Sequence, residues 1–312
     1  MTQKEQKEVL EGLSLSEKRI SPKFFYDDLG SRIFQKIMKM PEYYLTNCEN
    51  EIFVNHSKKI TEALGFKEEF YVVEFGAGDG SKTVHLLKTI MAQGYRINYA
   101  PIDISQEAIH HLEQRLKKQL PTLQMAPLVG DYFTILQNDL KAIKAHKLYL
   151  FLGSNIGNYG VDSVENLIEL FSQSMQVGDA FLLGVDLQKD PEVIRQAYDD
   201  PQGITKRFNL NLLTRLNREM KANFKLANFD FFCDYNPGSG ALKSYLVSLE
   251  DQEVTIAGKK IAFTKDEHIW TELSKKYTLK EIEGLAKRHG FTVKKHFLDA
   301  QGYFVNSLWI RS

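Results

Sequence analysis

The sequence VVEFGAGDGSKT, residues 72–83, contains the transition that decides the fold: a short apolar run, three closely spaced glycines and the start of a helical pattern. The apolar run predicts a buried strand, and the spacing of Val84, Leu87 and Met91 predicts a helix that ends near Gly94. Glycines let backbone approach a ligand closely, and the start of a helix offers unpaired N–H groups. The pattern is typical of a nucleotide-binding loop, although a simple tight turn would also account for it.

The alternation of strand and helix continues downstream. INYAPID predicts the next strand, and SQEAIHHLEQRLKKQLP places Ile109, Leu112, Leu116 and Leu120 on one face of a helix. The apolar segments APLVGDY, KLYLFLG and AFLLGVDL continue the series. Five apolar strands separated by helices predict a mainly parallel sheet with helices on both sides.

The last two predicted strands, FTVKKHFL and YFVNSLWI, are joined only by the short sequence DAQG. They must pair antiparallel, because a parallel crossover needs a dozen or more residues. The fold class is therefore α/β, and a seven-stranded Rossmann-like sheet that ends in an antiparallel hairpin is the plan of class I methyltransferases. This domain is expected to be discontinuous, with residues 49–187 and 278–312.

The segment between these two stretches departs from the alternation. ITKRFNLNLLTRLNREM predicts a helix, and FDFFCDY, ALKSYLVSLE, EVTIAG and EHIWTEL predict strands, with NPGSG as a turn. We therefore expect an inserted α+β unit.

Composition narrows the class of partner. The 312 residues carry 40 Lys plus Arg and 40 Asp plus Glu, so no overall positive charge favours nucleic acid. Cys48 and Cys233 are too few for a disulfide framework, and the eight histidines lack metal-ligand spacing. The polar N-terminus does not resemble a signal peptide, and no apolar run approaches the ~20 residues of a membrane helix. We expect a cytoplasmic monomer, without a metal site, that acts on a small molecule.

Acidic residues occur at three successive strand ends. Glu74 precedes the glycines, Asp103 could accept hydrogen bonds from ribose hydroxyls, and Asp131 could meet the amino group of an adenine. Asp103 could instead cap the helix that follows it. A dinucleotide fingerprint would have a third glycine where this chain has Ser81, which disfavours NAD. The three acids together predict S-adenosylmethionine (SAM) as cofactor. We expect further cofactor contacts from Gly76, Gly78, Lys82 and Tyr132.

The sequence FLGSNIGNYG, residues 151–160, ends the fourth predicted strand with a cluster of small and polar residues. A turn explains part of this cluster. A binding site explains more of it, because open α/β sheets hold their ligands at the carboxyl ends of their strands.

Along nearly its whole length the chain resembles the histidine-specific Nα-methyltransferase family of ergothioneine biosynthesis. The resemblance rests on PKFFYDDLGSRIF, MPEYYLT, VVEFGAGDGSKT, YAPIDIS, FLGSNIGN, LLGVDLQKDPEVIRQAYDD, FNLNLLTRLNRE and IWTELSKKY. It implies SAM as methyl donor, S-adenosylhomocysteine (SAH) as product, and a substrate-binding domain of residues 1–48 and 188–277.

The resemblance also implies which residues bind the reacting end of the substrate. Its α-amino and carboxylate groups would contact Asn158, Tyr198 and the backbone of Gly153, with Tyr26 near the amine. Asn158 and Tyr26 are thus the candidate catalytic residues. An asparagine suits this place, since it can accept from an N–H and donate to a carboxylate with one side chain.

The substrate's side chain would contact Tyr43, Glu272 and Ser274. Glu272 and Ser274 are two residues apart, so a strand presents both on one face, where a carboxylate and a hydroxyl could hold two imidazole nitrogens. Two positions depart from the family pattern: Asn155 replaces the usual threonine, and Ser244 stands where methionine is common. Ser244 would line the side-chain pocket, and a smaller residue there could admit a different substrate.

The leading hypothesis is a SAM-dependent Nα-methyltransferase that acts on L-histidine or a close analogue and gives the trimethylated betaine by in-line transfer. An N-methyltransferase of an indole or another aromatic amine, and a non-catalytic SAM-binding regulator, are the alternatives. An oxidoreductase with the same glycine loop is disfavoured by the missing third glycine and the terminal hairpin.

Overall fold

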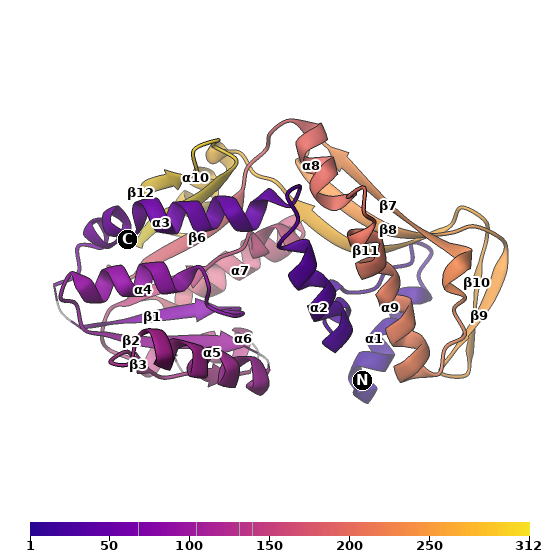
Figure 1. The fold of residues 1–312 in the computed structure, drawn as a ribbon, viewed down its shortest axis with the longest axis horizontal. Coiled ribbons are helices and arrows are strands. Elements are labelled where there is room, and N and C mark those ends of the chain that lie inside the picture. The colour runs from indigo at the N-terminus through magenta and orange to yellow at the C-terminus, as the bar shows by residue number, and fades with distance from the viewer. Residues whose placement is uncertain (68, 104, 131, 139) are drawn as a thin grey trace. The chain divides into compact units, whose positions relative to one another are not determined.

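The computed structural model describes the chain except for residues 68, 104, 131 and 139. The described residues form two compact units (Figure 1). We call Leu45–Gln188 with Lys276–Ser312 the sheet unit, and Met1–Tyr44 with Lys189–Lys275 the insert unit. From the sequence we expected the boundaries at 48/49, 187/188 and 277/278.

The sheet unit is built on one mixed sheet. In the described part of the chain its strand order is β12–β13–β6–β5–β1–β2–β3, and β4 also pairs with β2. Its strands are β1 Phe70–Phe75, β2 Ile97–Asp103, β3 Gln124–Met125, β4 Leu128–Val129, β5 Lys147–Phe151, β6 Ala180–Asp186, β12 Phe291–Leu298 and β13 Phe304–Arg311.

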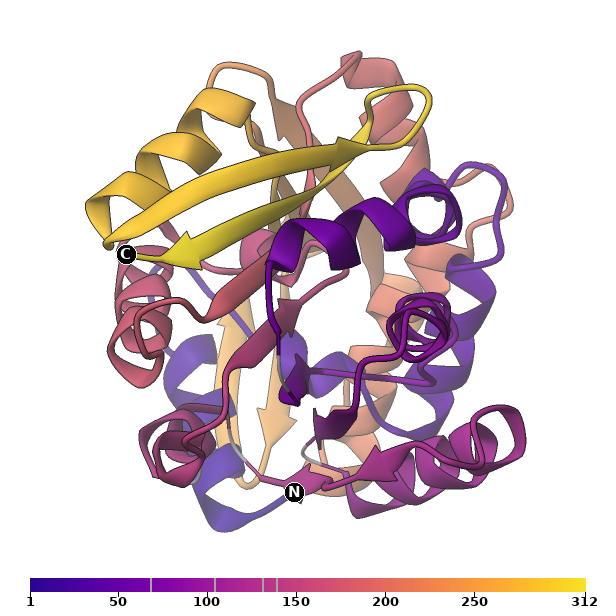
Figure 2. The same cartoon turned by 90° about the vertical axis from the view of Figure 1, so that its left-hand side faces the viewer.

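The central strands have the character of a parallel sheet covered on both faces. β5 and β6 are buried at every position, and β1, β2, β5 and β6 pair in parallel. β13 pairs antiparallel with both β6 and β12, and the hairpin is seen as two yellow strands in Figure 2. The predicted α/β class and the antiparallel C-terminal hairpin are confirmed.

The third predicted strand differs from expectation. Instead of one strand, the structure has β3 and β4, each of two residues, with Pro127 between them. Proline has no N–H to donate and is confined to edges and breaks of a sheet. The outermost position on the parallel side of the sheet is therefore shared by two short strands, so that the described residues form eight strands where seven were expected.

Helices follow the strands of the sheet unit as predicted. They are α3 Tyr44–Leu64, which begins at the last residue of the insert unit, α4 Thr83–Ala92, α5 Gln106–Gln119, α6 Tyr132–Gln137, α7 Val161–Ser174 and α10 Leu279–Arg288, with short 3-10 turns at Leu140–Ala142 and Asn155–Asn158. α6, α7 and α10 share one hydrophobic core with β1, β5 and β6. This core fixes the strand ends that carry the candidate site.

The chain leaves and re-enters the sheet unit at adjacent points. The Tyr277 N–H donates to the Asp186 carbonyl at 3.0 Å, and the Gln188 N–H donates to the Tyr277 carbonyl at 2.9 Å. Asp186 and Lys276 form an ion pair of 2.8 Å in which both side chains are fully buried. This short parallel pairing joins the end of β6 to the start of the C-terminal stretch.

The insert unit packs helices on a three-stranded antiparallel sheet of order β11–β8–β7. Its elements are α1 Gln3–Leu13, the 3-10 turn η1 Pro22–Phe25, α2 Asp28–Ile37, α8 Pro191–Tyr198, α9 Ile204–Met220, the 3-10 turn Leu226–Asn228, β7 Phe229–Asn236, β8 Ala241–Ser248, β9 Gln252–Ile256, β10 Lys259–Phe263 and β11 His268–Lys275. The predicted helix and four strands are present. β10, which pairs with β9, was missed because KKIAF is too short and charged to stand out.

The N-terminal arm joins the insert unit through backbone pairing. The Ile20 N–H donates to the Trp270 carbonyl at 2.9 Å, and the Trp270 N–H donates to the Lys18 carbonyl at 2.8 Å. The arm and the insert also share one hydrophobic core, in which α9 contributes Phe208, Leu212 and Leu216 at helical spacing. Segments far apart in sequence thus form a single folded unit.

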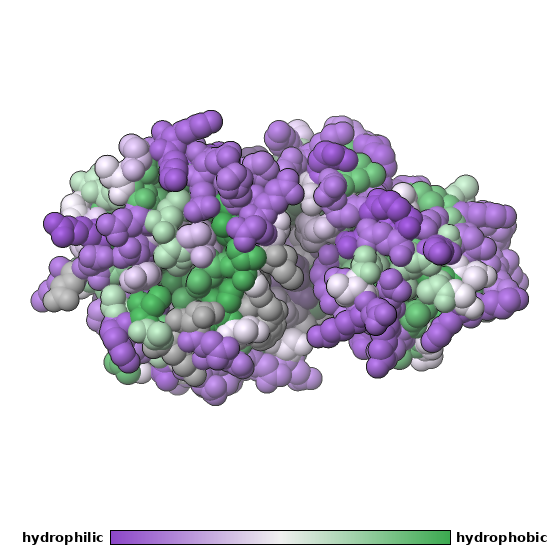
Figure 3. Space-filling view, turned by 90° about the horizontal axis from the view of Figure 1, so that it is seen from below, coloured by the Kyte–Doolittle hydropathy of each residue, from purple (hydrophilic) through white to green (hydrophobic). Residues whose placement is uncertain are grey.

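Charged and polar residues cover much of the face in Figure 3, with smaller hydrophobic areas between them. Within the described residues, no helix has the length and apolar character that crossing a bilayer requires.

Replacing Lys276 by methionine should lower the free energy of unfolding by about 3–5 kcal/mol, because the buried Asp186 carboxylate would lose the ammonium group that neutralises it. Urea denaturation measures this loss. Adding Asp186→Asn should restore part of it, whereas Lys280→Met, at an exposed position, should change little. A loss for K276M no larger than for K280M would contradict the importance of the pair.

Candidate functional site

The glycine loop between β1 and α4 turns tightly. Gly76, Gly78 and Gly80 all have positive φ angles, of 70°, 54° and 65°. A Cβ at Gly80 would lie 2.5 Å from Leu112 of α5, whereas a Cβ at Gly78 would meet no atom within 4 Å. Gly80 therefore serves packing, and Gly78 leaves open space in front of the loop.

Glu74 lies beneath this loop and is bonded within the protein. Its carboxylate accepts from the Thr83 hydroxyl at 2.5 Å and from the Tyr99 hydroxyl, and the residue is 3% exposed. Desolvation raises the pKa of Glu74 to about 7, although Thr83, Tyr99 and Lys82 act in the opposite direction. These partners make Glu74 a support for the loop.

The next strand end carries Asp103, which is half-buried at the last position of β2. One of its carboxylate oxygens accepts from the Ser105 N–H at 2.9 Å. Ser105 itself caps α5, since its hydroxyl accepts from the Ala108 N–H. The residue that caps α5 is therefore Ser105 and not Asp103. Asp131 lies outside the described residues, and Tyr132 is the first residue of α6.

The strand end after β5 forms a left-handed turn and then a 3-10 turn. Gly153 and Ser154 have φ angles of 72° and 58°, and Asn155–Asn158 form the 3-10 turn. The buried Ser154 hydroxyl accepts from the Asp186 N–H at 3.0 Å, which joins the ends of β5 and β6. Asn158 is exposed and Asn155 is half-buried. Nothing in the structure explains why Asn155 replaces the expected threonine.

One residue at this edge was missed by the sequence analysis. Glu49, in α3, is fully buried, pairs with Lys82 and accepts from the Gly153 N–H at 2.9 and 3.2 Å. A single acid in a long helix gives no sequence signal, because its partners come from distant parts of the chain.

In the insert unit, aromatic residues form a connected cluster. The Tyr26 ring lies 5.5 Å from Phe34 and 5.8 Å from Phe208, and Tyr43 lies 6.3 Å from Phe34 and 6.1 Å from Tyr198. These are the edge-to-face distances that aromatic pairs favour. The structure therefore brings three tyrosines expected from the resemblance into one group, with two phenylalanines that the sequence analysis did not select.

Polar groups of β11 join this cluster. The Tyr198 and Ser274 hydroxyls are 2.8 Å apart. Tyr26 is 48% exposed as a residue, but desolvation raises the pKa of its phenol, and the nearby Glu272 and Tyr198 raise it further. Glu272 and Ser274 pair with Ser244 and Leu242 of β8, two positions apart, so they share one face.

Ser244 is opposite Glu272 in the strand register and is completely buried. In the described part of the chain its hydroxyl has no hydrogen-bond partner. A buried hydroxyl without a partner is costly in a native structure and is commonly explained by an absent ligand or water.

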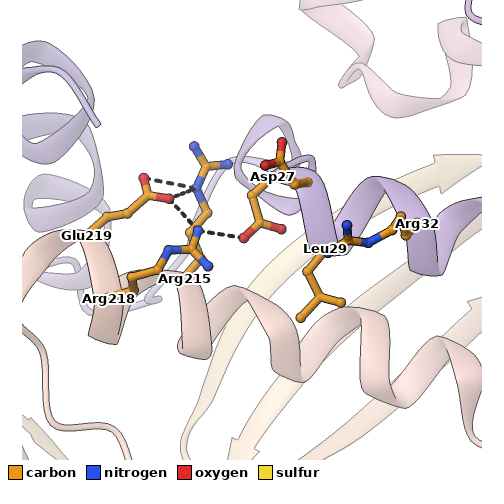
Figure 4. Close-up of a pocket in the computed structure, with 7 residues that line it drawn as sticks. Asp27, Leu29, Arg32, Arg215, Arg218 and Glu219 are labelled. Carbon is orange, nitrogen blue, oxygen red and sulfur yellow. Dashed lines mark hydrogen bonds and ion pairs between the residues drawn. The ribbon is translucent and has the colours of Figure 1, made fainter.

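The segment that carries Tyr26 is anchored on both sides. The Arg215 guanidinium donates to the Phe24 carbonyl at 3.0 Å, and the Asp27 carboxylate accepts from Gly30, Asn211 and Arg218. A cavity of about 520 Å³ lies beside these ion pairs (Figure 4). It is lined by Asp27, Asp28, Leu29, Arg32, Arg215, Arg218 and Glu219. Its opposite charges largely pair with one another, and its lining is separate from the residues expected to contact substrate.

The strand order, the glycine loop and the antiparallel hairpin define a class I SAM-dependent methyltransferase. A solved structure of an O-methyltransferase family protein from Burkholderia thailandensis is similar to this fold, with a TM-score of 0.50, 10% identity, and 99% of this chain and 69% of that chain covered.

Sequence comparison identifies the family within that class. The family described as histidine-specific methyltransferase, SAM-dependent, matches residues 5–311. Histidine N-alpha-methyltransferases of Mycolicibacterium smegmatis and Mycobacterium tuberculosis are 30% and 29% identical, over 98% and 97% of this chain and 94% and 93% of theirs. An N-methyltransferase of Aspergillus flavus is 24% identical, over 95% of this chain and 82% of its own. The chain belongs to the histidine-specific, SAM-dependent methyltransferase family and is a SAM-dependent N-methyltransferase.

Glu74→Gln should remove a pH dependence from the stability of the protein. Below pH 4.5, the ordinary pKa, the carboxyl group is protonated in folded and unfolded chains alike. Between pH 4.5 and about 7 the unfolded chain has released this proton while the folded chain keeps it, so stability falls as the pH rises through this window to the folded pKa of about 7. The loss amounts to about 3 kcal/mol.

Unfolding midpoints from pH 4 to pH 9 measure this effect. Relative to the wild-type protein, the E74Q variant should become more stable as the pH rises. Glu62→Gln, at an exposed position of α3, should show the same pH dependence of stability as the wild type. Parallel curves for E74Q and wild type would refute the assignment.

Proposed function

We propose that the protein methylates the α-amino group of L-histidine, or of a close analogue, and carries the reaction to the trimethylated betaine. The proposal rests on membership of the family together with one observation in the insert unit. Glu272, Ser274 and Tyr198 gather a carboxylate and two hydroxyls beside an aromatic cluster. A carboxylate and a hydroxyl can bond the two ring nitrogens of an imidazole, while the tyrosine rings pack against its faces.

Each candidate residue takes a role in this proposal. In the insert unit, Glu272 and Ser274 hold the imidazole, Tyr43 packs on it, and Tyr198 and Tyr26 bind near the amino acid's polar end. Ser244 is the last residue of this side-chain site, and its buried hydroxyl would bond a further polar atom of the substrate.

The sheet unit is proposed to hold the reacting groups and the cofactor. Asn158 and the backbone of Gly153 bind the amino and carboxylate groups of the substrate. The proposed cofactor residues are Glu74, Gly76, Gly78, Lys82, Asp103, Asp131 and Tyr132. Glu74 supports the loop from below, as its hydrogen bonds indicate.

When bound, SAM supplies a methyl group activated by a cationic sulfur. The work of the chain is then to align the amine nitrogen with that methyl group, and orientation of this kind is worth ~7–11 kcal/mol of barrier. Asn158 orients the amine by accepting from its N–H while donating to the carboxylate. Because an ammonium has no lone pair, the amine must be neutral; a free α-amino group has a pKa of about 8. Desolvation and a nearby positive charge favour its neutral form.

Calorimetric titration with amino acids in the presence of SAH tests the substrate. Histidine should bind more tightly than tryptophan or phenylalanine, and Glu272→Gln should weaken histidine binding by about 10- to 100-fold, the worth of a charge-assisted hydrogen bond. The control is Glu253→Gln, an exposed acid of β9. Equal weakening for all three amino acids, or none, would contradict the imidazole assignment.

Tighter binding of an indole or another aromatic amine would favour the alternative substrate class. The buried, unpartnered Ser244 hydroxyl among the described residues is the observation that favours it. Binding of SAH with no amino acid would favour a regulator that does not catalyse.

Asn158→Asp should lower kcat/KM by about 100-fold, because the new negative charge would repel the substrate carboxylate. Steady-state methyl transfer from SAM to histidine measures this change. Asn166→Asp makes the same substitution at an exposed position of α7 and should leave the rate near that of the wild type. Near-normal activity of N158D would remove Asn158 from the site.

A further inference from the structure

One extra residue in β11, Thr271, decides which face of the sheet Glu272 lies on. Residues directly opposite each other in an antiparallel pair lie on the same face. Ile269 of β11 is opposite Leu246 of β8. Two residues away along β8, Ser244 is opposite Glu272, which is three residues after Ile269. The register shift between these pairs is a β-bulge, in which β11 has one residue more than β8.

Without this bulge, Glu272 would lie on the opposite face. Side chains alternate between faces along a strand, so Thr271, two residues after Ile269, would be opposite Ser244. Glu272 would then point away from Ser244. The bulge instead brings Glu272 and, two residues later, Ser274 to the face that carries Ser244. Bulges are common next to active sites, where they change the direction of a side chain.

The bulged residue is held from the interior of the insert unit by α9. Thr271 is 1% exposed, and its hydroxyl donates to the Asn209 amide oxygen at 3.0 Å and to the Ser244 carbonyl at 3.1 Å. Asn209 is completely buried, and its amide nitrogen donates to the Thr205 carbonyl, in the first turn of α9, at 3.1 Å. Thr271 is thus hydrogen-bonded both to the helix and to the neighbouring strand.

Two further contacts hold β11 on either side of the bulge. The indole N–H of Trp270 donates to the Glu272 carbonyl at 2.8 Å, so it spans the bulge. The Ser274 and Tyr198 hydroxyls, 2.8 Å apart, join the end of β11 to α8. Polar groups of α8, α9 and β11 therefore fix the point at which the alternation of side chains changes.

Packing alone does not require the bond between Thr271 and Asn209. The buried side of α9 is otherwise mainly apolar, with Phe208, Leu212 and Leu216 in the core. Burying a hydroxyl and an amide is costly, and their hydrogen bonds add little net stability. Apolar side chains of similar size would fill the same space. The geometry that this bond gives to β11 explains its presence better than stability does.

We propose that Thr271 and Asn209 are positioning residues for the methyl-transfer reaction: they fix the bulge that turns Glu272 and Ser274 toward the side chain of the amino-acid substrate. The inference rests on the proposed function, in which Glu272 and Ser274 hold that side chain. It extends that function by assigning substrate specificity to two residues that act through Glu272. Cofactor binding should not depend on them, because the glycine loop belongs to the sheet unit.

Calorimetric titration of the full chain with histidine, in the presence of SAH, tests the proposal. Thr271→Val keeps the branched shape and removes the hydroxyl, so histidine affinity should fall about 10-fold while SAH affinity stays within about twofold. Thr271→Ser retains the hydroxyl and should bind histidine as the wild type does. Thr61→Val removes an equally buried hydroxyl from α3 and, as the matched control, should change neither affinity.

A double-mutant cycle shows whether Thr271 acts through Glu272. If it does, the variant with both T271V and E272Q should bind histidine within about twofold of E272Q alone. Losses that multiply would overturn the proposal, and so would unchanged histidine affinity in T271V when E272Q weakens it. No loss in E272Q would instead contradict the substrate assignment, and this inference would fail with it.

The comparison of the two ligands separates positioning from a general structural role. Equal losses of histidine and SAH affinity in T271V would reduce Thr271 to a part of the fold. If T271V does not fold, Asn209→Ala removes the acceptor from α9 and leaves Thr271 its bond to the Ser244 carbonyl. The same loss of histidine affinity alone is then expected, and wild-type binding by N209A would refute the proposal.

Discussion

The buried ion pair between Asp186 and Lys276 is the constraint on which the discontinuous sheet depends. The sheet unit consists of two stretches of chain, and this pair joins the end of the first to the start of the second. After this junction the chain continues through α10 and β12 to β13, which pairs with β6 from Phe304 to Ile310 and completes the sheet. Removing one charge of a buried ion pair strongly destabilises the fold, because the other charge is left buried and uncompensated. This junction therefore tolerates little substitution.

Asp186, Glu74 and Glu49 are all buried acids of the sheet unit, but their different hydrogen-bond and ion-pair partners give them different roles. Asp186 is neutralised by Lys276, and Glu74 accepts from the hydroxyls of Thr83, at the start of α4, and Tyr99, in β2. Glu49 differs from both, since its partners, Lys82 and the Gly153 N–H, belong to the segments that face a ligand in this fold. Glu49 thus joins α3 to the loop after β1 and to the turn after β5.

Much of the fold could be predicted from the sequence, because most of its helices and strands depend on a local pattern of residues. Apolar strands, helical stripes and the short DAQG connection predicted the α/β sheet and its antiparallel end. Pro127 divided the third strand through a missing N–H, a local effect that the analysis overlooked. The contacts of Glu49 could not be predicted, since Lys82 and Gly153 are distant from it in the sequence and approach it only in the folded chain. For Asp103 the sequence left two roles open, a helix cap and a ligand contact. The structure shows that Ser105 caps α5.

The adjacent exit points of the sheet unit also bear on how such a chain can fold and diverge. The Gln188 N–H and the Tyr277 carbonyl are within hydrogen-bond distance, so the whole insert is a loop whose ends already touch. The entropy lost on closing a loop grows only with the logarithm of its length. Lengthening, shortening or exchanging that segment therefore costs the sheet little, and a lineage can remodel what the enzyme recognises while its methyl-transfer scaffold stays intact.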